Sequence, residues 1–401
     1  MTPSARIAAA ADVLDRVLAG VGAESALTNW GRASRYAGSG DRSAIRDLVF
    51  SALRCRRSFA ALGGGLTGRG LMLGLAREAG QDVGVLFNGE GHALAPPGPQ
   101  EAGRAPDPLE ALDCPDWLAP DLKASLGSGF APVMERLRHR APVFLRVNAA
   151  RIDVAGATAA LAAEGIGAVP HRVAGFALEV MEGARKIQSC STYAEGLVEL
   201  QDASSQAVVE ALPLTAGMRV LDLCAGGGGK TLAMAARAPV RVWAHDAHPR
   251  RMKDLLPRAI RAGARISISD NPENTAPYHL VLADVPCSGS GSWRRDPEGK
   301  WTLTPANLAK IEVLQAAILD RAAPMVAVGG VLAYATCSLL SAENEAQVTE
   351  FLARNRTWDC KLQRRFTPLD GGDGFFLAIL TCKKNWPTQS EDVSSVFFSE
   401  S

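Results

Sequence analysis

Hydrophobic positions in the first part of the chain follow a helical period. Apolar side chains recur three or four residues apart at Ala8, Ala11, Leu14, Val17 and Leu18. A second amphipathic stretch, 43–62, repeats this spacing, and neither stretch alternates apolar and polar residues as a half-buried strand does. The pattern predicts an all-helical domain over 1–92.

The spacing of hydrophobic residues changes after residue 92. Residues 93–107 are rich in Pro, Gly and Ala, which predicts a linker. After a helical stretch at 117–137, the pattern predicts a strand through FLRVN (144–148), then a helix and two short strands. We expect a small α/β domain over 108–196.

From residue 197 onward, strand-like apolar runs alternate with helical runs, including a long predicted helix at 305–328. This alternation predicts a mostly parallel, doubly wound sheet with helices on both faces, which is a Rossmann-like domain over 197–384. The last apolar run, GFFLAILTC (374–382), is predicted as an edge strand. The polar tail at 385–401 is predicted to be disordered.

Composition narrows the class of protein. The 401 residues are 47% hydrophobic, contain no apolar run of 18 residues and begin with an amphipathic pattern, so we expect no membrane span or signal peptide and a cytoplasmic protein. The eight cysteines form no C-x-x-C pair, which argues against a disulfide framework or a metal site. The net charge of +1 identifies no partner, but arginines cluster at 54–57, 136–140 and 294–295, where they could bind phosphates or simply face solvent.

A glycine-rich loop follows the first strand of the predicted parallel sheet. The strand, 220–223, leads into Gly226, Gly227, Gly228 and Gly229 and a helix that starts near Lys230. Glycines allow the backbone to approach a ligand at the carboxyl end of a parallel strand. A phosphate-binding P-loop would need glycine where Cys224 stands, so that reading fails, whereas the glycines alone do not exclude a dinucleotide fold.

Acidic residues end the first three strands of this domain, at Asp222, Asp246 and Asp270. Asp246 could accept hydrogen bonds from ribose hydroxyls, and Asp270 would lie near an adenine ring, although both could instead cap the next helix or turn. Carboxylates beside a loop that is not a P-loop suit a cationic sulfonium nucleoside without phosphates. The pattern therefore favours S-adenosylmethionine as the cofactor.

Two cysteines follow the next two strands. Cys287 lies three residues after Asp284, and Cys337 follows the fifth strand, so both should project at the carboxyl edge of the sheet, whereas structural cysteines more often lie within strands. A thiolate that adds to carbon 6 of cytosine makes carbon 5 nucleophilic enough to accept a methyl group. Asp284 is placed to protonate or polarise the ring near N3, and Lys230 could reach the same pocket or remain in solvent.

Five motifs connect the chain to a known family: QDASSQ, DLCAGGGGKT, ADVPCSGSG, RRDPEGKW and YATCSLLSAENE. On these motifs the chain resembles the RsmB/Sun family of RNA 5-cytosine methyltransferases over most of its length. The N-terminal helices resemble the NusB-like RNA-binding domain of the RsmB branch, and FLRVN resembles the family's middle domain. The resemblance implies an RNA partner, with small-subunit ribosomal RNA favoured and transfer RNA as the alternative; we expect a monomer.

The resemblance also implies roles for single residues. Cys337 would be the nucleophile, Cys287 would assist product release, and Asp284 and Lys230 would assist catalysis. The implied methyl-donor site comprises Cys224, Ala225, Gly226, Gly227, Gly228, Gly229, Lys230, Asp246, Arg251, Asp270 and Asp284. Gly226 and Gly227 stand where the family usually has alanine and proline, which predicts a more flexible loop and weaker preorganisation of the cofactor site, without loss of activity.

Two other functions fit parts of the pattern. A DNA cytosine methyltransferase would use Cys287 as its nucleophile, and a non-catalytic RNA-binding or ribosome-assembly factor could retain the fold without the activity. Trp293, Arg294 and Arg295 follow the Pro-Cys loop and could stack on or pair with nucleic acid, or form an ordinary turn.

Overall fold

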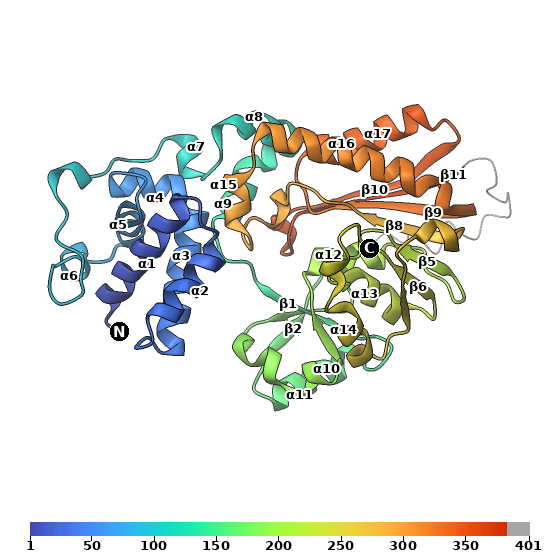
Figure 1. The fold of residues 1–401 in the computed structure, drawn as a ribbon, viewed down its shortest axis with the longest axis horizontal. Coiled ribbons are helices and arrows are strands. Elements are labelled where there is room, and N and C mark those ends of the chain that lie inside the picture. The colour runs from blue at the N-terminus through green and yellow to red at the C-terminus, as the bar shows by residue number, and fades with distance from the viewer. Residues whose placement is uncertain (383–401) are drawn as a thin grey trace.

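The chain folds into three lobes that follow one another in sequence (Figure 1). The computed structural model describes residues 1–382, and the tail predicted at 385–401 lies outside them. A helical lobe is followed by a small antiparallel sheet and then by a large, mostly parallel sheet. Within 1–382, no helix is long and apolar enough to cross a bilayer.

The first lobe is helical, as its periodicity predicts. Its helices are α1 (Pro3–Leu18), α2 (Ala23–Ala33), α3 (Ser39–Arg54), α4 (Arg56–Gly63), α5 (Gly68–Glu78) and α6 (Val83–Leu86). The side chains of Thr2 and Thr67 accept hydrogen bonds from the backbone of α1 and α5 and begin these helices. The apolar faces meet in one buried core, and the predicted stretch 43–62 is divided into α3 and α4 at Cys55.

The middle lobe is a four-stranded antiparallel sheet in the order β2-β3-β1-β4. Its strands are β1 (Val143–Val147), β2 (Ala168–Pro170), β3 (Ala177–Val180) and β4 (Val198–Leu200), and its helices are α10 (Val154–Ala163) and α11 (Ser191–Ala194). Three helices precede this sheet in sequence but do not share its core: α7 (Pro108–Ala111), α8 (Ala119–Leu126) and α9 (Phe130–Leu137). The buried apolar side chains of α8 and α9 pack against buried side chains of the third lobe, among them Trp293 and Leu339.

The third lobe is a seven-stranded sheet in the order β10-β11-β9-β8-β5-β6-β7. Its strands are β5 (Arg219–Asp222), β6 (Arg241–Ala244), β7 (Ile266–Ile268), β8 (Tyr278–Asp284), β9 (Val326–Thr336), β10 (Trp358–Phe366) and β11 (Phe375–Cys382). Its helices are α12 (Ala203–Glu210), α13 (Gly229–Arg237), α14 (Leu255–Ala262), α15 (Pro297–Thr302), α16 (Pro305–Ala322) and α17 (Glu345–Arg354). Strands β5 to β9 are parallel, and separate cores cover the two faces, which confirms the Rossmann-like prediction.

Two predicted elements of this lobe are wrong. The last strand, β11, is not an edge strand, because β10 pairs antiparallel with its outer side and β9 with its inner side. The helix predicted to reach residue 328 ends at Ala322, and Val326 already belongs to β9. Pro324 explains this ending, because proline has no N–H to continue the helical hydrogen bonds.

The helical lobe is fastened to the third lobe at the end of α3. The carbonyl oxygen of Arg54 accepts from Nζ of Lys300 at 3.0 Å, and the carbonyl oxygen of Leu53 accepts from Nε1 of Trp301 at 2.6 Å. In return, Nε of Arg54 donates to the carbonyl oxygen of Arg294 at 2.7 Å. Helix α15 therefore caps the carboxyl end of α3, and Figure 1 shows it beside the helical lobe.

Lys300 makes this contact sensitive to pH. Its side chain is 1% exposed, and burial lowers the pKa of its ammonium to about 8. The unfolded chain therefore binds more protons than the folded chain between pH 8 and roughly pH 10.4, so this group makes stability rise with pH in that window.

We expect Lys300→Met to remove that pH dependence. The wild type should gain about 2 kcal/mol from Lys300 between pH 7.5 and 9.5, and the variant should lack this gain. Denaturant unfolding at the two pH values measures the difference, with the exposed Lys310→Met as the matched control. Equal pH dependence in the wild type and Lys300→Met would contradict the assignment.

Candidate active site

The glycine loop lies between β5 and α13, at the carboxyl edge of the parallel strands. Gly226 and Gly228 have φ values of +52° and +81°, a conformation that favours glycine. A Cβ at Gly228 would also lie 2.0 Å from a methyl carbon of Leu255. The loop thus has a shape that bulkier residues would strain, with Gly226 and Gly228 buried and Gly227 exposed.

Asp246 holds the rim of this loop. It lies two residues beyond β6 and is 3% exposed. Its carboxylate accepts from the backbone N–H of Gly226 at 3.0 Å and of His248 at 2.8 Å, and Arg251 lies 3.5 Å away. The structure therefore brings together the glycine loop, Asp246 and Arg251 from separate parts of the sequence.

A buried ion pair lies beside the loop. Nζ of Lys230, in the first turn of α13, donates to Asp284 at the end of β8 at 2.7 Å. Burial by itself lowers the pKa of Lys230, but Asp284 and, less strongly, Cys337 outweigh it and raise that pKa. The ammonium stays charged and lies within electrostatic range of the Cys337 sulfur.

The two cysteines meet at the next loops of the same edge. Sγ of Cys287 and Sγ of Cys337 lie 3.3 Å apart, although the residues are 50 positions apart in sequence. Both side chains are partly exposed. The hydrogen bond with Cys337, burial and the nearby Glu343 carboxylate raise the pKa of Cys287 well above its usual value. Cys287 is therefore held as a thiol.

Glu343 joins the two cysteine loops, and the sequence analysis gave it no role. It is fully buried, and its carboxylate accepts from the backbone N–H of Ser288 at 2.7 Å and from Gln315 at 3.0 Å. The hydroxyl of Ser338 donates to it from the other loop. Its only signal in the sequence is an acidic residue shortly after the TCS motif, because its partners come from distant segments.

Other predicted residues have different surroundings. Cys224 lies in the loop, where burial and the carboxylate of Asp222 raise its pKa, so it is a poor candidate for a reactive thiol. Asp270 follows β7 and is exposed. Ala225 donates its N–H to the carbonyl oxygen of His245, which ties the start of the loop to the segment after β6.

The nucleic-acid contact suggested for 293–295 is wrong for Trp293 and Arg294, which are buried, and stays a prediction for Arg295, which is exposed. Trp293 is 1% exposed and belongs to the core shared with α8 and α9. Arg294 is 3% exposed and donates to Asp373 at 2.8 Å, and Arg295 bridges Asp373 and Asp202. Carboxylates of the same chain pair with both guanidinium groups, and only that of Arg295 remains partly open to solvent.

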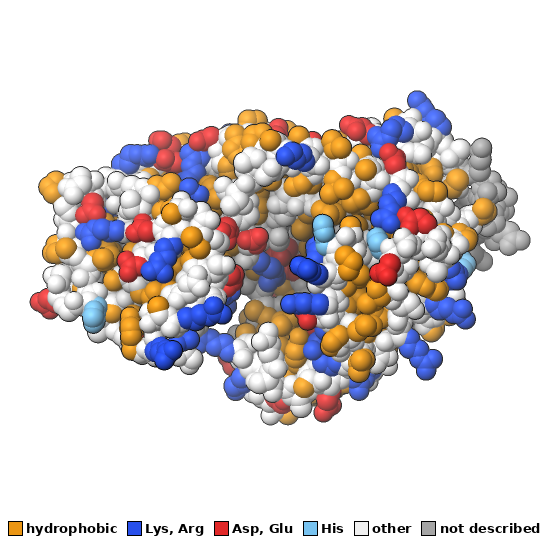
Figure 2. Space-filling model, viewed as in Figure 1, with side chains coloured by type: hydrophobic (Ala, Val, Ile, Leu, Met, Phe, Trp, Pro, Cys, Tyr) orange, Lys and Arg blue, Asp and Glu red, His pale blue; other side chains and the backbone are white. Residues whose placement is uncertain are grey.

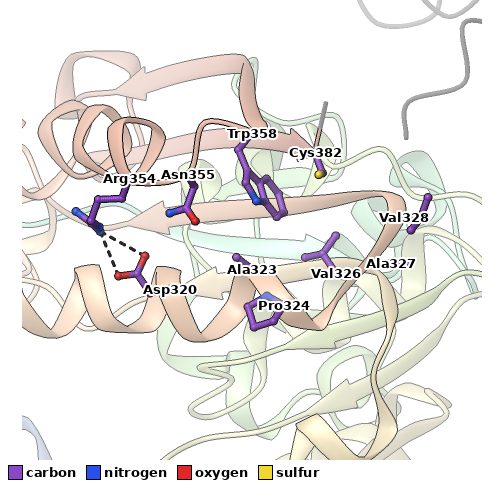
Figure 3. A pocket seen from close by; sticks show the side chains of 10 residues that line it. All are labelled: Asp320, Ala323, Pro324, Val326, Ala327, Val328, Arg354, Asn355, Trp358 and Cys382. Carbon is purple, nitrogen blue, oxygen red and sulfur yellow. Dashed lines mark hydrogen bonds and ion pairs between the residues drawn. The ribbon is translucent and has the colours of Figure 1, made fainter. Parts of the chain in front are cut away.

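A cavity of about 560 Å³ lies away from this site (Figure 3). Its walls come from the end of α16, the start of β9, the end of α17, the start of β10 and the end of β11, with Trp358 and Val328 among the lining residues. The start of β9 is opposite the end that carries Cys337. The reactive groups therefore lie at the other edge of the sheet from this cavity.

The residues of the site fit S-adenosylmethionine. An open glycine loop without the P-loop pattern is surrounded by the carboxylates of Asp222, Asp246 and Asp284, and Oδ1 of Asp222 is buried without a hydrogen-bond partner. Carboxylates suit a cationic nucleoside and would repel phosphates. The loop with Asp246 and Arg251 would hold the nucleoside, beside the two cysteines.

Comparisons with known proteins agree with this geometry. The family model described as 16S rRNA methyltransferase RsmB/F matches residues 209–397, and the RsmF/B-like ferredoxin-like domain matches 114–186. Together they cover more than half of the chain. Both matches begin after the N-terminal helices, whose NusB-like nature stays a prediction.

Relatives of the chain include ribosomal RNA methyltransferases of two enterobacteria. Ribosomal RNA small subunit methyltransferase B of Salmonella arizonae is 33% identical over 287 residues, and that of Citrobacter koseri is 32% identical. Each alignment spans 67% of this chain and 66% of the relative, so it covers about two thirds of either protein.

Solved structures share the fold. The crystal structure of PH0851 has a TM-score of 0.75 at 21% identity and covers 95% of this chain and 99% of its own. NSun6 from Pyrococcus horikoshii with SFG has a TM-score of 0.60 at 17% identity, covering 68% of this chain and 99% of its own.

The Rossmann-like sheet and its acidic glycine loop define the class of S-adenosylmethionine-dependent methyltransferases. Within that class, the chain belongs to the RsmB/F methyltransferase family, as its sequence motifs predict.

Proposed function

We propose that this protein methylates carbon 5 of a cytosine in small-subunit ribosomal RNA, with Cys337 as the covalent nucleophile. The observation that carries the proposal is the 3.3 Å contact between the sulfurs of Cys287 and Cys337, at the sheet edge that also holds Lys230 and Asp284. Nucleophilic addition to a pyrimidine, followed by elimination, requires a thiolate and groups that handle protons in one place. The names of the relatives support ribosomal RNA as the substrate.

The environments of the two sulfurs support different roles for them. Lys230 is a buried cation whose pKa is raised by Asp284 and, less strongly, by Cys337, so its charge lies near the Cys337 sulfur. Cys287 has its pKa raised by Cys337, by burial and by Glu343. The position of Cys337 in the TCS motif supports it as the nucleophile and argues against the chemistry of a DNA cytosine methyltransferase, in which Cys287 would attack.

In the proposed mechanism, the Cys337 thiolate forms a bond to carbon 6 of the cytosine, and its electron pair makes carbon 5 nucleophilic. Asp284 can take a proton from the Lys230 ammonium that donates to it and pass that proton to N3, which lowers the barrier to this addition. S-adenosylmethionine, when bound, supplies the methyl group. Solvent water then takes the carbon 5 proton, the C–H electron pair re-forms the double bond between carbons 5 and 6, and Cys337 leaves as a thiolate. Cys287 assists this release.

The surface offers room for an RNA strand. Figure 2 shows a hollow in the face where the three lobes meet, with basic and acidic side chains around it. Arg140, 69% exposed, reaches Asp47 of α3, and Arg185 of the middle lobe lies 4.0 Å from the same carboxylate. At this point two exposed cations face one anion, which supports attraction to phosphates.

Bisulfite sequencing of ribosomal and transfer RNA from a deletion strain tests the proposal. One cytosine of small-subunit ribosomal RNA should resist conversion in the parent and convert in the deletion strain. The purified protein should restore the methyl group to that RNA in vitro, and more weakly to matched DNA. If no ribosomal cytosine changes, or if the change lies only in transfer RNA, the proposed substrate is wrong.

A further inference from the structure

The four glycines of the donor loop leave its backbone with little stiffness of its own, because glycine loses the most conformational freedom on folding. The loop nevertheless has a defined shape, in which Gly226 and Gly228 both have positive φ. Contacts from outside the loop must therefore supply part of the order. Asp246 supplies one such contact, at the N–H of Gly226.

A second contact comes from helix α14. Nη1 of Arg258 donates to the carbonyl oxygen of Gly227, in the middle of the loop. The guanidinium group is itself held, because its Nε lies 3.5 Å from the carboxylate of Glu199. Glu199 belongs to β4 of the middle lobe and is 5% exposed. The chain of contacts thus runs from the middle sheet through Arg258 to the donor loop.

A third contact crosses the same boundary. Nη1 of Arg146, in β1, donates to the carbonyl oxygen of Gly229 at 2.7 Å. Arg146 is 6% exposed, and its Nε has no hydrogen-bond partner. Burial of an arginine without a hydrogen-bonded carboxylate is costly, and the hydrogen bonds of its Nη1 to Oε1 of Gln201 and to Gly229 offset part of that cost. Two arginines therefore hold alternate carbonyl groups of the glycine loop.

We propose that Arg258, anchored by Glu199, is a positioning residue that orders the glycine loop for the methyl donor. It acts through the carbonyl oxygen of Gly227 and makes the middle lobe part of the donor site. This role offsets the flexibility expected where Gly226 and Gly227 replace bulkier residues. The inference rests on the donor site of the proposed function and is independent of the RNA substrate.

Arg258→Ala tests this role through binding. Titration calorimetry with S-adenosylhomocysteine should give a Kd raised by about tenfold, the effect of losing one charge-assisted hydrogen bond. Hydrogen exchange of the ligand-free protein should become faster in residues 225–230. Arg258→Lys keeps a donor for Gly227 and should bind within about threefold of the wild type, because most of that hydrogen bond survives.

Arg261→Ala is the matched control. Arg261 lies one turn further along α14 and pairs with Glu199 at 2.8 Å, but it has no hydrogen bond to the loop. Its Kd should stay within about threefold of the wild type. The proposal is overturned if Arg258→Ala binds as tightly as the wild type, or if Arg261→Ala weakens binding as much. Because the readouts are binding and exchange, they do not depend on whether the RNA substrate is identified correctly.

Discussion

Cys337→Ala should lower methyl transfer to RNA by at least about three orders of magnitude, because the variant lacks the group that activates carbon 5. The variant should also form no covalent adduct with an RNA that carries 5-fluorocytosine at the target position. Transfer of labelled methyl groups measures the first effect, and a denaturing gel measures the second. The fold should persist, because Cys337 is partly exposed and its loop is held by Ser338 and Glu343.

Cys287→Ala is the matched variant, because its sulfur lies 3.3 Å from that of Cys337. It should lower turnover yet keep the adduct, since the nucleophile remains and only release is impaired. A gel band of protein bound to unmodified RNA is therefore expected with this variant. The opposite pattern, with the adduct lost only in Cys287→Ala, would indicate the DNA type of mechanism. Full activity in both variants would exclude covalent catalysis by either sulfur.

Asp284→Asn should lower the single-turnover rate by about two to three orders of magnitude, the range of general acid–base catalysis. The amide keeps the shape of the side chain but cannot act as the acid, and it leaves the Lys230 ammonium buried without its anion. The rate is measured at saturating RNA and methyl donor, so that weaker binding does not enter the comparison.

The double variant Lys230→Met/Asp284→Asn tests whether Lys230 and Asp284 act on the rate as one ion pair or independently of each other. If the two residues act as one unit, the double variant should be little slower than Asp284→Asn alone. Asp12→Asn, an exposed carboxylate on α1, is the control and should leave the rate unchanged. A loss of less than about fivefold in Asp284→Asn would remove Asp284 from the proposed mechanism, because general acid catalysis contributes far more.

Some of the predictions follow from local pattern and are met in the structure. The glycines at 226–229 directly follow an apolar strand, so their place at the carboxyl edge of a parallel sheet could be read from the sequence. The same reasoning places Cys287 after β8 and Cys337 after β9. Parallel strands share one edge, which brings these groups together whatever the details of packing.

Other predictions failed because the deciding partner is distant in sequence. Strand β10 carries charged residues at most of its exposed positions, so its apolar pattern is weak and does not predict a strand. Without β10, the sequence predicts β11 as the edge of the sheet. Arg294 and Arg295 stand in a basic run that suggests nucleic acid, but Asp373, nearly 80 residues later, pairs with both. The sequence around an arginine gives no sign of a carboxylate that approaches it only when the chain folds.

The sequence by itself determined the order of the three lobes, the parallel sheet, the acidic glycine loop and the two cysteines at its edge, because each depends on short-range periodicity or on the residues that end a strand. Only the tertiary structure decided which groups neighbour one another: Glu343 between the cysteine loops, Lys300 beneath the helical lobe, and Arg258 on the donor loop. The physical reason is that hydrogen bonds and ion pairs of buried charges are satisfied by whichever side chains the fold brings within about 3 Å.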